Sequence, residues 1–559
     1  MPVIVVNNTD LKQDIMWKDK YFCEKRFRDS SADKERKEKK GLKKDDPRLA
    51  CESDFGRVVF SSSCRRLHDK TQVFPLTNDD NLHSRLTHSM EVMNVGLSFA
   101  LRLSKNDEFL KRSGFEESDA YRYLSAILKT SGLVHDIGNP PFGHFGEESI
   151  RTYFYNLFES IEQELETDKN QTVKLYHNAI LNHVIRDKKG KVLDIDERKK
   201  RIDSLRDFLK SDARLDYTQF DGNAQGFRVL TKLQFLDDLC GLNLTYATLA
   251  ATLKYPNVGK KEEKPVHKHK HGVFTTEKPY LIEIAKECGM EKEGTYIRHP
   301  LTYLMEAADS ICYLTMDVED GCSKRSWLSF KAIQNEFSAI VGEDRKFLTF
   351  LDEKKIDYTG QYFKKAVVDM RTCLLAYFID KTITNFLKNL DKIEEGLYTG
   401  QDPKNEGELV YDDSLKVGQH MMNVTKKYIL SQREIHSLEI AGDAIIKGIM
   451  DCLIGLLFSN REPYRNRGKN FISRSIFLTT LQEYFVDQEV NKEKDPESQS
   501  KKYFDEIKNP TVKAEDKYDD FDVYDFSVEE RLRIIRDFVA CMTDKFALNF
   551  YQKLSGQKV

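Results

Sequence analysis

The chain has 559 residues, of which 40% are apolar and 32% are charged, and its formal net charge is -3. This length is ample for a large buried core and suggests about three or four domains. The small net charge excludes a global field that would favour nucleic acid or membranes, so any charge preference must be local.

Membrane and secretory signals are absent from the sequence. No stretch reaches the roughly 18 apolar residues that a membrane span needs, and the apolar run within the first eight residues is short for a secretory signal. The 10 cysteines contain no C-x-x-C pair and predict reduced thiols. We therefore expect a cytoplasmic protein without membrane contact.

In chain order, the first predicted element is a polar arm over residues 1–53, which contains the basic patch 34–44. This patch suits a polyanion, although a solvated tail is the alternative. Apolar residues then recur at helical spacing and predict helices over 90–103 and 120–134. The second of these helices ends at a glycine that is followed by two prolines.

Helical patterns continue to the end of the chain. They cover 147–215, 242–253, 300–318, 361–390, 413–430, 435–458 and 527–554. Polar stretches at 391–412 and 488–520 predict surface loops. Strand signals are confined to residues 3–6 and to a hairpin near Phe274, and no internal repeat, Walker-type phosphate loop or G-x-G-x-x-G motif occurs.

The strongest local feature is His135-Asp136 at the end of an apolar helix. Such a pair can bind one cation where the helix end opens to a cleft, although an ordinary surface turn is the alternative. His88 and Asp309 extend the set, and a buried carboxylate such as Asp309 needs a partner. This mixed nitrogen and oxygen set suits Mn²⁺, Fe²⁺, Co²⁺, Ni²⁺ or Mg²⁺ and argues against a closed zinc site.

Several further motifs occur in a fixed order along the chain. They are Arg66, Lys70-Thr71-Gln72-Val73-Phe74-Pro75, Arg85-Leu86-Thr87-His88-Ser89, Gly132 to Glu147, Asp221 to Arg228, Gly241 to Tyr246, Lys254-Tyr255-Pro256, Glu306-Ala307-Ala308-Asp309 and Met542-Thr543-Asp544. Together they resemble the deoxyguanosinetriphosphate triphosphohydrolases of the HD superfamily. The resemblance covers most of residues 54–320 and returns near the C-terminus.

The resemblance implies an all-α architecture. It places the HD catalytic core at 54–330, with a charged insertion at about 159–215. A C-terminal helical region, 331–559, is expected to pack on this core.

The resemblance also implies a metal-dependent reaction. His88, His135, Asp136 and Asp309 match the family's metal ligands, with Mn²⁺ or Mg²⁺ expected first. The implied reaction is attack at the α-phosphorus of dGTP, or of another deoxynucleoside triphosphate. It releases the deoxynucleoside and tripolyphosphate.

His144 and Glu147 are assigned to catalysis by the same resemblance. They are three residues apart and share one face if the segment is helical. A histidine suits proton transfer because its pKa lies near working pH. Whether His144 acts as an acid, as a base or by placing water stays open, and a helix cap is the structural alternative.

Three basic residues and a tyrosine are expected to contact the phosphates. Arg85 lies one helical turn before His88, so its guanidinium can reach a phosphate beside the metal. Lys254 and Tyr255 look like the family's phosphate-contacting pair. Lys270 is a second candidate, for which a solvated loop lysine is the alternative.

The sugar contacts are expected from other segments. Tyr313 and Asp317 follow Asp309 by four and eight residues, and Tyr313 can pack on the sugar and disfavour a 2′-hydroxyl, or else be a core aromatic. Gln72 looks like the family's contact to the 3′-hydroxyl. Asn223, like Gln225, is expected to line the pocket or to orient a ligand.

One position departs from the family pattern. Asp221 stands where a glutamate is expected, which puts regulation and assembly in doubt rather than chemistry. Two other functions are alternatives to the triphosphohydrolase that the resemblance implies. One is an HD phosphohydrolase of another substrate class, such as a 5′-nucleotidase or cyclic-nucleotide phosphodiesterase, and the other is a non-catalytic module that binds nucleotides or single-stranded nucleic acid.

Partners are expected from the resemblance as well. A closed homo-oligomer, from dimer to hexamer, fits the family. Single-stranded DNA is a candidate effector that the basic patches at 34–44 and 186–201 permit, with solvated loops as the alternative.

Overall fold

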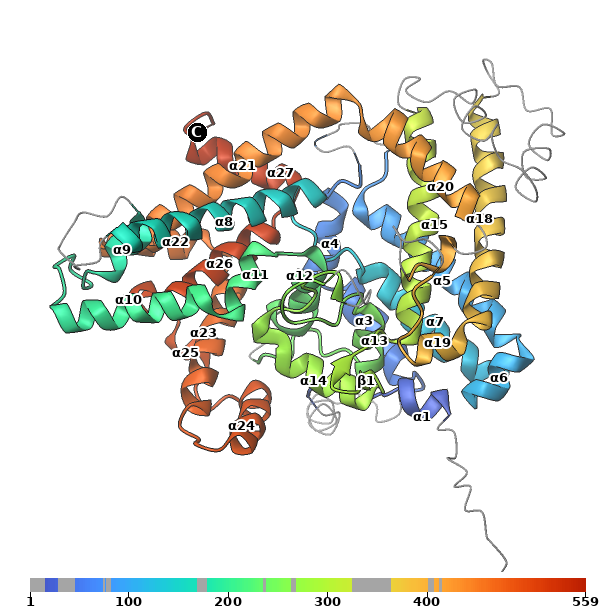
Figure 1. Ribbon diagram of the computed structural model, residues 1–559, viewed down its shortest axis with the longest axis horizontal. Coiled ribbons are helices and arrows are strands. Elements are labelled where there is room, and N and C mark those ends of the chain that lie inside the picture. Colours follow the sequence, from blue (N-terminus) through green and yellow to red (C-terminus); the bar gives the residue numbers. More distant parts are fainter. Residues whose placement is uncertain are drawn as a thin grey trace, which may run out of the picture.

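The computed structural model describes residues 16–28, 46–73, 76, 82–167, 178–234, 238–262, 268–323, 363–400, 407–411 and 415–558. The predicted strand at 3–6 and the basic patch at 34–44 lie outside these residues. Within them the chain is almost entirely helical, so the predicted all-α class is confirmed (Figure 1).

One group of helices forms the right-hand part of Figure 1. Its members are α1 (Trp17–Tyr21), α5 (Arg85–Ser104), α6 (Asp107–Ser113), α7 (Glu117–Val134), α15 (Pro300–Ser323), α18 (Phe363–Lys388), α19 (Leu390–Glu394), α20 (Leu415–Val424), the 3-10 turn η6 (Leu409–Tyr411) and the π-helical η7 (Thr425–Leu430). Here α5 packs along α7, α15 contacts both, and α18 packs on α15.

The close approach of α5 and α7 depends on a glycine. A Cβ atom on Gly132 of α7 would lie 3.2 Å from the backbone of Met93 in α5. Any larger residue would therefore push the two helices apart. This antiparallel contact places the first turn of α5, which Ser84 caps, beside the last turn of α7.

The centre of the molecule consists of shorter elements. They are α3 (Ala50–Val59), α4 (Ser62–Arg66), η1 (Leu67–Asp69), α12 (Gly222–Arg228), the π-helical η3 (Val229–Leu233), α13 (Tyr246–Thr252), η5 (Thr275–Glu277), α14 (Lys278–Glu287), and the strands β1 (Glu291–Lys292) and β2 (Thr295–Tyr296). The two strands form an antiparallel hairpin.

A second group of helices forms the left-hand part of Figure 1. It contains α8 (Gly143–Thr167), α9 (Ala179–Val184), α10 (Ile195–Lys210), η2 (Asp212–Arg214), α11 (Leu215–Thr218), α21 (Arg433–Leu457), α22 (Glu462–Phe471), α23 (Arg474–Val490), α24 (Pro496–Lys508), α25 (Ala514–Lys517), η8 (Val523–Asp525), α26 (Val528–Ala540) and α27 (Asp544–Leu554). The long helix α21 contacts α8, α26 and α27.

Buried apolar side chains form two clusters. One combines residues from α8, α12, α14, α21, α23 and α26, and the other combines residues from α5, α7, α15, α18 and α20. Each cluster therefore joins segments from both sides of residue 330. The predicted division into an arm, a core over 54–330 and a C-terminal region stays a prediction.

Four local predictions are wrong. The predicted surface loop at 391–412 contains most of α19 and the turn η6, whose three residues are buried. The stretch 488–520 contains the helix α24, which Asp495 caps and whose Ile507 is buried. No hairpin forms at Phe274, which precedes the turn η5, and the hairpin of the described residues lies at 291–296. The helix predicted from residue 242 begins only at Tyr246, because Thr245 caps it.

The sequence predicts neither a membrane-spanning helix nor a disulfide, and both features can be examined in the described residues. None of the helices in the described part of the chain combines the length and apolarity that crossing a bilayer would require. All ten cysteines lie within the described ranges, and they form no disulfide.

Candidate metal centre and active site

The four predicted metal ligands meet where α5, α7 and α15 come together. His88 lies in the first turn of α5, His135 and Asp136 directly follow α7, and Asp309 lies on α15. Asp309 Oδ1 is 3.0 Å from His88 Nε2 and 3.5 Å from His135 Nε2. Asp136 Oδ2 is 3.6 Å from His135 Nε2. The ligand atoms of His88, His135 and Asp309 lie within 4.8 Å of one another. Asp136 lies beside this group and forms an ion pair with Arg85.

The ring of His135 is oriented to receive a cation. Its Nδ1 lies 2.8 Å from the carbonyl oxygen of Gly132. A carbonyl only accepts, so Nδ1 carries a proton and donates it there. The buried Nε2 has no hydrogen-bond partner. An unpartnered nitrogen beside carboxylates fits a divalent metal ion.

The charges around this group also favour a cation. Burial disfavours charge on His135, but the carboxylates of Asp136 and Asp309 outweigh it and raise the pKa of His135 to about 9. Asp136 is held by an ion pair with Arg85 and by Asn139 Nδ2, which donates to Asp136 Oδ1 at 2.7 Å. Burial opposes ionisation of Asp136, yet Arg85 and His135 bring its pKa to about 2.

The metal-ligand cluster forms part of the wall of a cavity of about 420 Å³, a volume typical of small-molecule sites. The predicted site residues that line it are Gln72, Arg85, His135, Asp136, His144, Glu147, Asn223, Lys254, Lys270, Asp309, Tyr313 and Asp317. His88 is buried behind Asp309. In the described part of the chain, the lining does not include Tyr255 or Gln225.

His144 and Glu147 lie at the start of α8 and form a hydrogen-bonded pair. His144 is 79% exposed, whereas Glu147 is 3% exposed, and Nδ1 of the imidazole lies 3.2 Å from Glu147 Oε2. The other carboxylate oxygen accepts a hydrogen bond of 2.8 Å from the backbone N–H of Gly222. Glu147 therefore orients the imidazole of His144 through Nδ1, and His144 lines the cavity.

Each cationic residue of the wall is paired with a carboxylate. Lys254 Nζ lies 2.9 Å from Glu306, and Lys270 Nζ lies 2.8 Å from Asp221. The ring of Tyr255 packs 5.8 Å from the Lys254 ammonium and 5.6 Å from the Lys270 ammonium. Tyr255 thus makes cation–π contacts with the two lysines and does not line the cavity.

Asp221, the residue that departs from the family pattern, caps the helix α12. Its Oδ1 accepts hydrogen bonds from the backbone N–H of Asn223 at 2.9 Å and from Asn223 Nδ2 at 2.6 Å. Gln225, one helical turn further on, is fully buried, so it cannot line the cavity as expected. The shorter carboxylate therefore holds both Lys270 and Asn223 at the cavity wall.

The predicted sugar contacts Gln72, Tyr313 and Asp317 line the same cavity as the metal ligands, and Tyr313 and Asp317 lie on α15 with Asp309. The Tyr313 hydroxyl is hydrogen-bonded to the hydroxyl of Tyr411, and Gln72 Oε1 is buried without a partner. Burial, together with the nearby Asp320, raises the pKa of Asp317. These polar groups can accept or donate hydrogen bonds to a ligand in the cavity.

Sequence reasoning missed one wall of the cavity. It consists of Met422, Thr425, Leu430, Ile435 and Glu439, from α20, η7 and α21. The helical periodicity predicts that these segments are helices, but it does not predict that they line the cavity. Glu439 provides the carboxylate of this otherwise mostly apolar wall.

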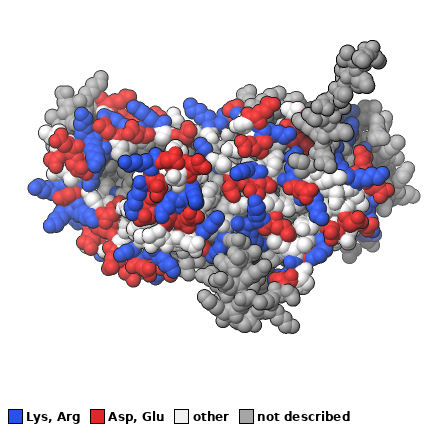
Figure 2. All heavy atoms as spheres, turned by 90° about the horizontal axis from the view of Figure 1, so that it is seen from below, with Lys and Arg blue, Asp and Glu red and all other residues white. Residues whose placement is uncertain are grey.

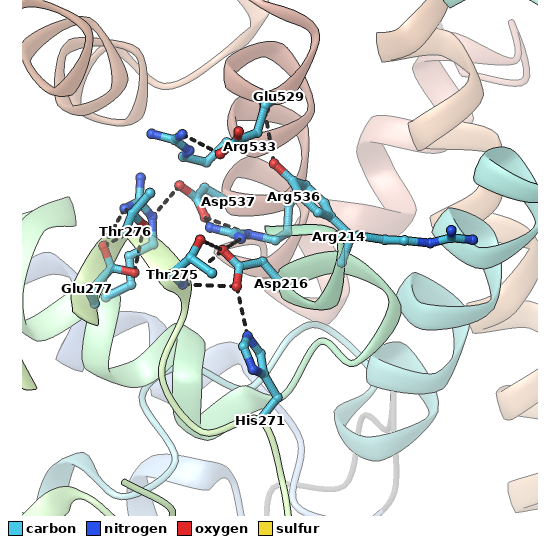
Figure 3. A network of polar contacts seen from close by, with 12 residues as sticks. Arg214, Asp216, His271, Thr275, Thr276, Glu277, Glu529, Arg533, Arg536 and Asp537 are labelled. Atoms are coloured by element: carbon cyan, nitrogen blue, oxygen red, sulfur yellow. Dashed lines mark hydrogen bonds and ion pairs between the residues drawn. The ribbon is translucent and has the colours of Figure 1, made fainter. Parts of the chain in front are cut away.

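The loop that carries Lys270 is anchored from beneath by a buried polar network (Figure 3). Asp216 accepts hydrogen bonds from His271 Nε2 at 2.7 Å and from Thr275 Oγ1 at 2.7 Å. Arg536 of α26 packs its guanidinium 3.8 Å from the ring centre of Phe274. The C-terminal helices thus support the loop that carries Lys270.

Comparison with known proteins identifies the fold and family. The HD domain matches residues 85–205, which contain three of the four candidate metal ligands. A deoxyguanosinetriphosphate triphosphohydrolase-like protein of Listeria innocua is 30% identical over 545 residues, which are 96% of this chain and 99% of the relative. The chain belongs to the deoxyguanosinetriphosphate triphosphohydrolase family.

Other members of the triphosphohydrolase family show the same relation. A triphosphohydrolase-like protein of Pseudomonas aeruginosa is 35% identical over 346 residues, which are 59% of this chain and 67% of the relative. The deoxyguanosinetriphosphate triphosphohydrolase of Klebsiella pneumoniae is 27% identical and covers 90% of this chain and 93% of that protein. The similarity to the Klebsiella pneumoniae protein thus extends over most of both chains.

The surface of this triphosphohydrolase family member carries mixed charges. Lys and Arg alternate with Asp and Glu over the described face in Figure 2. Within the basic patch 186–201, Lys188 pairs with Asp525 at 2.7 Å and Arg201 pairs with Glu197 at 2.9 Å. These pairs favour a solvated face for this patch, and an effector role of single-stranded DNA stays a prediction.

Proposed function

We propose that this protein is a deoxynucleoside triphosphate triphosphohydrolase that prefers dGTP. The observation that carries the proposal is one cavity that joins the metal-ligand cluster, the pair His144–Glu147 and three cationic residues. The names of the full-length relatives agree with this substrate class. The alternative of an HD phosphohydrolase with another substrate class explains the metal ligands but not the sugar-facing residues.

The triphosphate is the most highly charged part of the substrate and determines its orientation. Arg85, Lys254 and Lys270 line the same cavity and bind its oxygens. Each already has a carboxylate partner, so the cationic side chains are held in place before the substrate enters. This places the α-phosphorus beside the metal ligands.

His88, His135, Asp136 and Asp309 would hold the metal ion, with Mn²⁺ or Mg²⁺ preferred. When bound, such an ion supplies Lewis-acid activation of phosphate and water. The 5′-oxygen of the sugar leaves as an alkoxide and needs a proton. His144 lines the cavity and supplies that proton, while Glu147 holds its Nδ1 and keeps the imidazole oriented.

The sugar and base are read on the remaining walls. Gln72 and Asp317 contact the 3′-hydroxyl, and the ring of Tyr313 leaves no room for a 2′-hydroxyl. Guanine presents two adjacent N–H donors on its pairing edge, and the carboxylate of Glu439 matches them because it only accepts hydrogen bonds. Adenine presents an acceptor at the corresponding ring nitrogen, which Glu439 repels.

The test is a product analysis. Purified protein is incubated with Mn²⁺ or Mg²⁺ and each of the four dNTPs, plus GTP, and the products are separated by ion exchange. We expect tripolyphosphate and the matching deoxynucleoside, formed fastest from dGTP, and no tripolyphosphate from GTP. Nucleoside monophosphate with pyrophosphate, or stepwise release of phosphate, would refute the proposed reaction.

The proposed oligomeric state follows from the expectation that members of this family form closed homo-oligomers. We propose a closed homo-oligomer, between a dimer and a hexamer, that works in the cytoplasm. Light scattering coupled to gel filtration gives its mass directly, and repeating the assay with single-stranded DNA tests that effector.

A further inference from the structure

The Met542-Thr543-Asp544 sequence near the C-terminus has no part in the proposed chemistry, yet its aspartate reaches the active site. Asp544 is the first residue of α27 and is 3% exposed. Its Oδ1 accepts a hydrogen bond of 2.9 Å from the backbone N–H of Phe142. Its Oδ2 accepts hydrogen bonds from Thr71, from the backbone N–H at 3.1 Å and from Oγ1 at 2.7 Å.

These donors belong to the two segments that deliver key side chains to the cavity. Thr71 directly precedes Gln72, and Phe142 lies two residues before His144. Thr71 and Phe142 themselves line the cavity. One carboxylate, more than four hundred residues along the chain from both segments, therefore ties them together.

The backbone at Phe142 needs such support. Phe142 has a φ of 65°, in the left-handed region that residues with a side chain rarely adopt. A conformation of this kind costs about 1–3 kcal/mol and persists where surrounding contacts hold it. The hydrogen bond from Phe142 to Asp544 acts on that residue directly, at the turn from which α8 and His144 start.

A second contact joins the same three segments. The buried Lys70 donates from Nζ to the carbonyl oxygen of Ala540, at 3.3 Å, and also to the carbonyl oxygen of Asn139. Lys70 precedes Thr71, Asn139 precedes the turn at Phe142, and Ala540 ends α26. The hydrogen bonds of Asp544 and Lys70 therefore connect the end of α26 and the start of α27 with the segment of Gln72 and with the turn before His144.

We propose that Asp544 is a positioning residue, which holds the turn before His144 and the segment of Gln72 in the mutual arrangement that the reaction needs. The inference rests on the proposed function for its kinetic consequence, although the geometry stands without it. In this arrangement the C-terminal helix pair completes an active site whose reacting groups come from the first 320 residues.

The test compares Asp544→Asn with Asp495→Asn. Asp495 caps α24, so both substitutions remove a charge from a helix N-terminus, but α24 carries no residue of the cavity wall. Asp544→Asn keeps the side-chain volume and presents an amide N–H₂ to N–H donors. Because small displacements of reacting groups cost up to about 10²-fold in rate, we expect kcat to fall about 10- to 100-fold. Asp495→Asn should leave kcat unchanged.

A second readout does not depend on turnover. The imidazole resonances of His144, assigned by NMR through loss in His144→Gln, are expected to shift and broaden in Asp544→Asn but not in Asp495→Asn. Thr71→Val, which removes only the hydroxyl donor, covers the case in which Asp544→Asn fails to fold. It is expected to give a smaller kcat loss and a smaller resonance shift in the same direction.

The outcomes separate the two proposals. If the wild type hydrolyses no dNTP, the proposed function fails, and the His144 resonances alone decide the role of Asp544. Unchanged kcat and unchanged His144 resonances in Asp544→Asn would overturn the positioning role. A kcat loss that only follows the loss of folded protein, with native His144 resonances in the remainder, would overturn it as well.

Discussion

Within the described residues, the metal-ligand cluster and the buried charged cluster around Arg228 differ in how their charges are matched. In the cluster beneath the Lys270 loop, Arg228 lies 2.7 Å from Glu277, 2.8 Å from Glu483 and 2.7 Å from Asp537. Lys232 adds a contact of 2.8 Å to Glu483. In the metal-ligand cluster, by contrast, His135 Nε2 is buried without a hydrogen-bond partner.

The difference distinguishes a structural cluster from a site. Unpaired buried charges are costly, so a cluster that only stabilises the fold is expected to satisfy its own charges. The Arg228 cluster does so with protein groups from α12, η5, α23 and α26. The metal-ligand cluster leaves His135 Nε2 without a hydrogen-bond partner beside the carboxylates of Asp136 and Asp309, a set that an external cation can bind.

The largest expected effect comes from the metal-ligand cluster. We expect His135→Ala to lower kcat/KM by about 10³-fold or more, since the Lewis-acid contribution is several kcal/mol. Mn²⁺ at 100 times its Kd should stabilise the wild type by about 2.7 kcal/mol and the variant hardly at all. Thermal unfolding with and without Mn²⁺ measures this. Equal stabilisation of both proteins would show that the ion binds elsewhere.

The Arg228 cluster should show the opposite pattern. Arg228→Met removes one cationic partner from each of three buried carboxylates, so we expect the free energy of unfolding to fall by about 3 kcal/mol. Stabilisation by Mn²⁺ should remain. Urea unfolding measures the loss, and Arg102→Met, at an exposed pair with Asp380, is the control with a loss below about 1 kcal/mol. A loss in Arg228→Met no larger than in the control would contradict the comparison.

His271 links the structural network to the cavity. It is buried and hydrogen-bonded to Asp216, and it directly follows the cavity-lining Lys270. Loss of its hydrogen bond to Asp216 should loosen the loop and raise KM for dGTP about tenfold, with a smaller change in kcat. Steady-state kinetics of His271→Gln measure this, with the exposed His68→Gln as control. An unchanged KM would separate the network from substrate binding.

The smallest expected effect concerns the mostly apolar wall of the cavity that contains Glu439. Glu439→Gln replaces an acceptor by an amide that can also donate, so it should pair less selectively with guanine. We expect the ratio of kcat/KM for dGTP to that for dATP to fall about tenfold, with little change in metal affinity. Competition assays with both nucleotides give this ratio directly. A preserved ratio would place base recognition on other residues.

Features that depend on neighbours in the chain were predictable from the sequence. His135 and Asp136 are adjacent, so any helix that ends there presents both groups together, and the spacing of His144 and Glu147 places them on one face of α8. Helical periodicity located α7, α15, α18 and α21 closely. The helix α24 was missed because it is largely charged and exposed, which hides its few buried residues.

Contacts across long sequence separations were decided only by the tertiary structure. The sequence by itself determined the all-α class, and the resemblance of its ordered motifs supplied the candidate ligand set and the candidate pair His144–Glu147. Only the packing of distant helices places Glu439 at the cavity and buries Gln225. The same packing pairs Asp221 with Lys270. It also brings Asp544 into contact with Thr71 and Phe142. The physical reason is that periodicity tells which face of a helix is buried, whereas the partner of that face depends on how distant helices pack against one another.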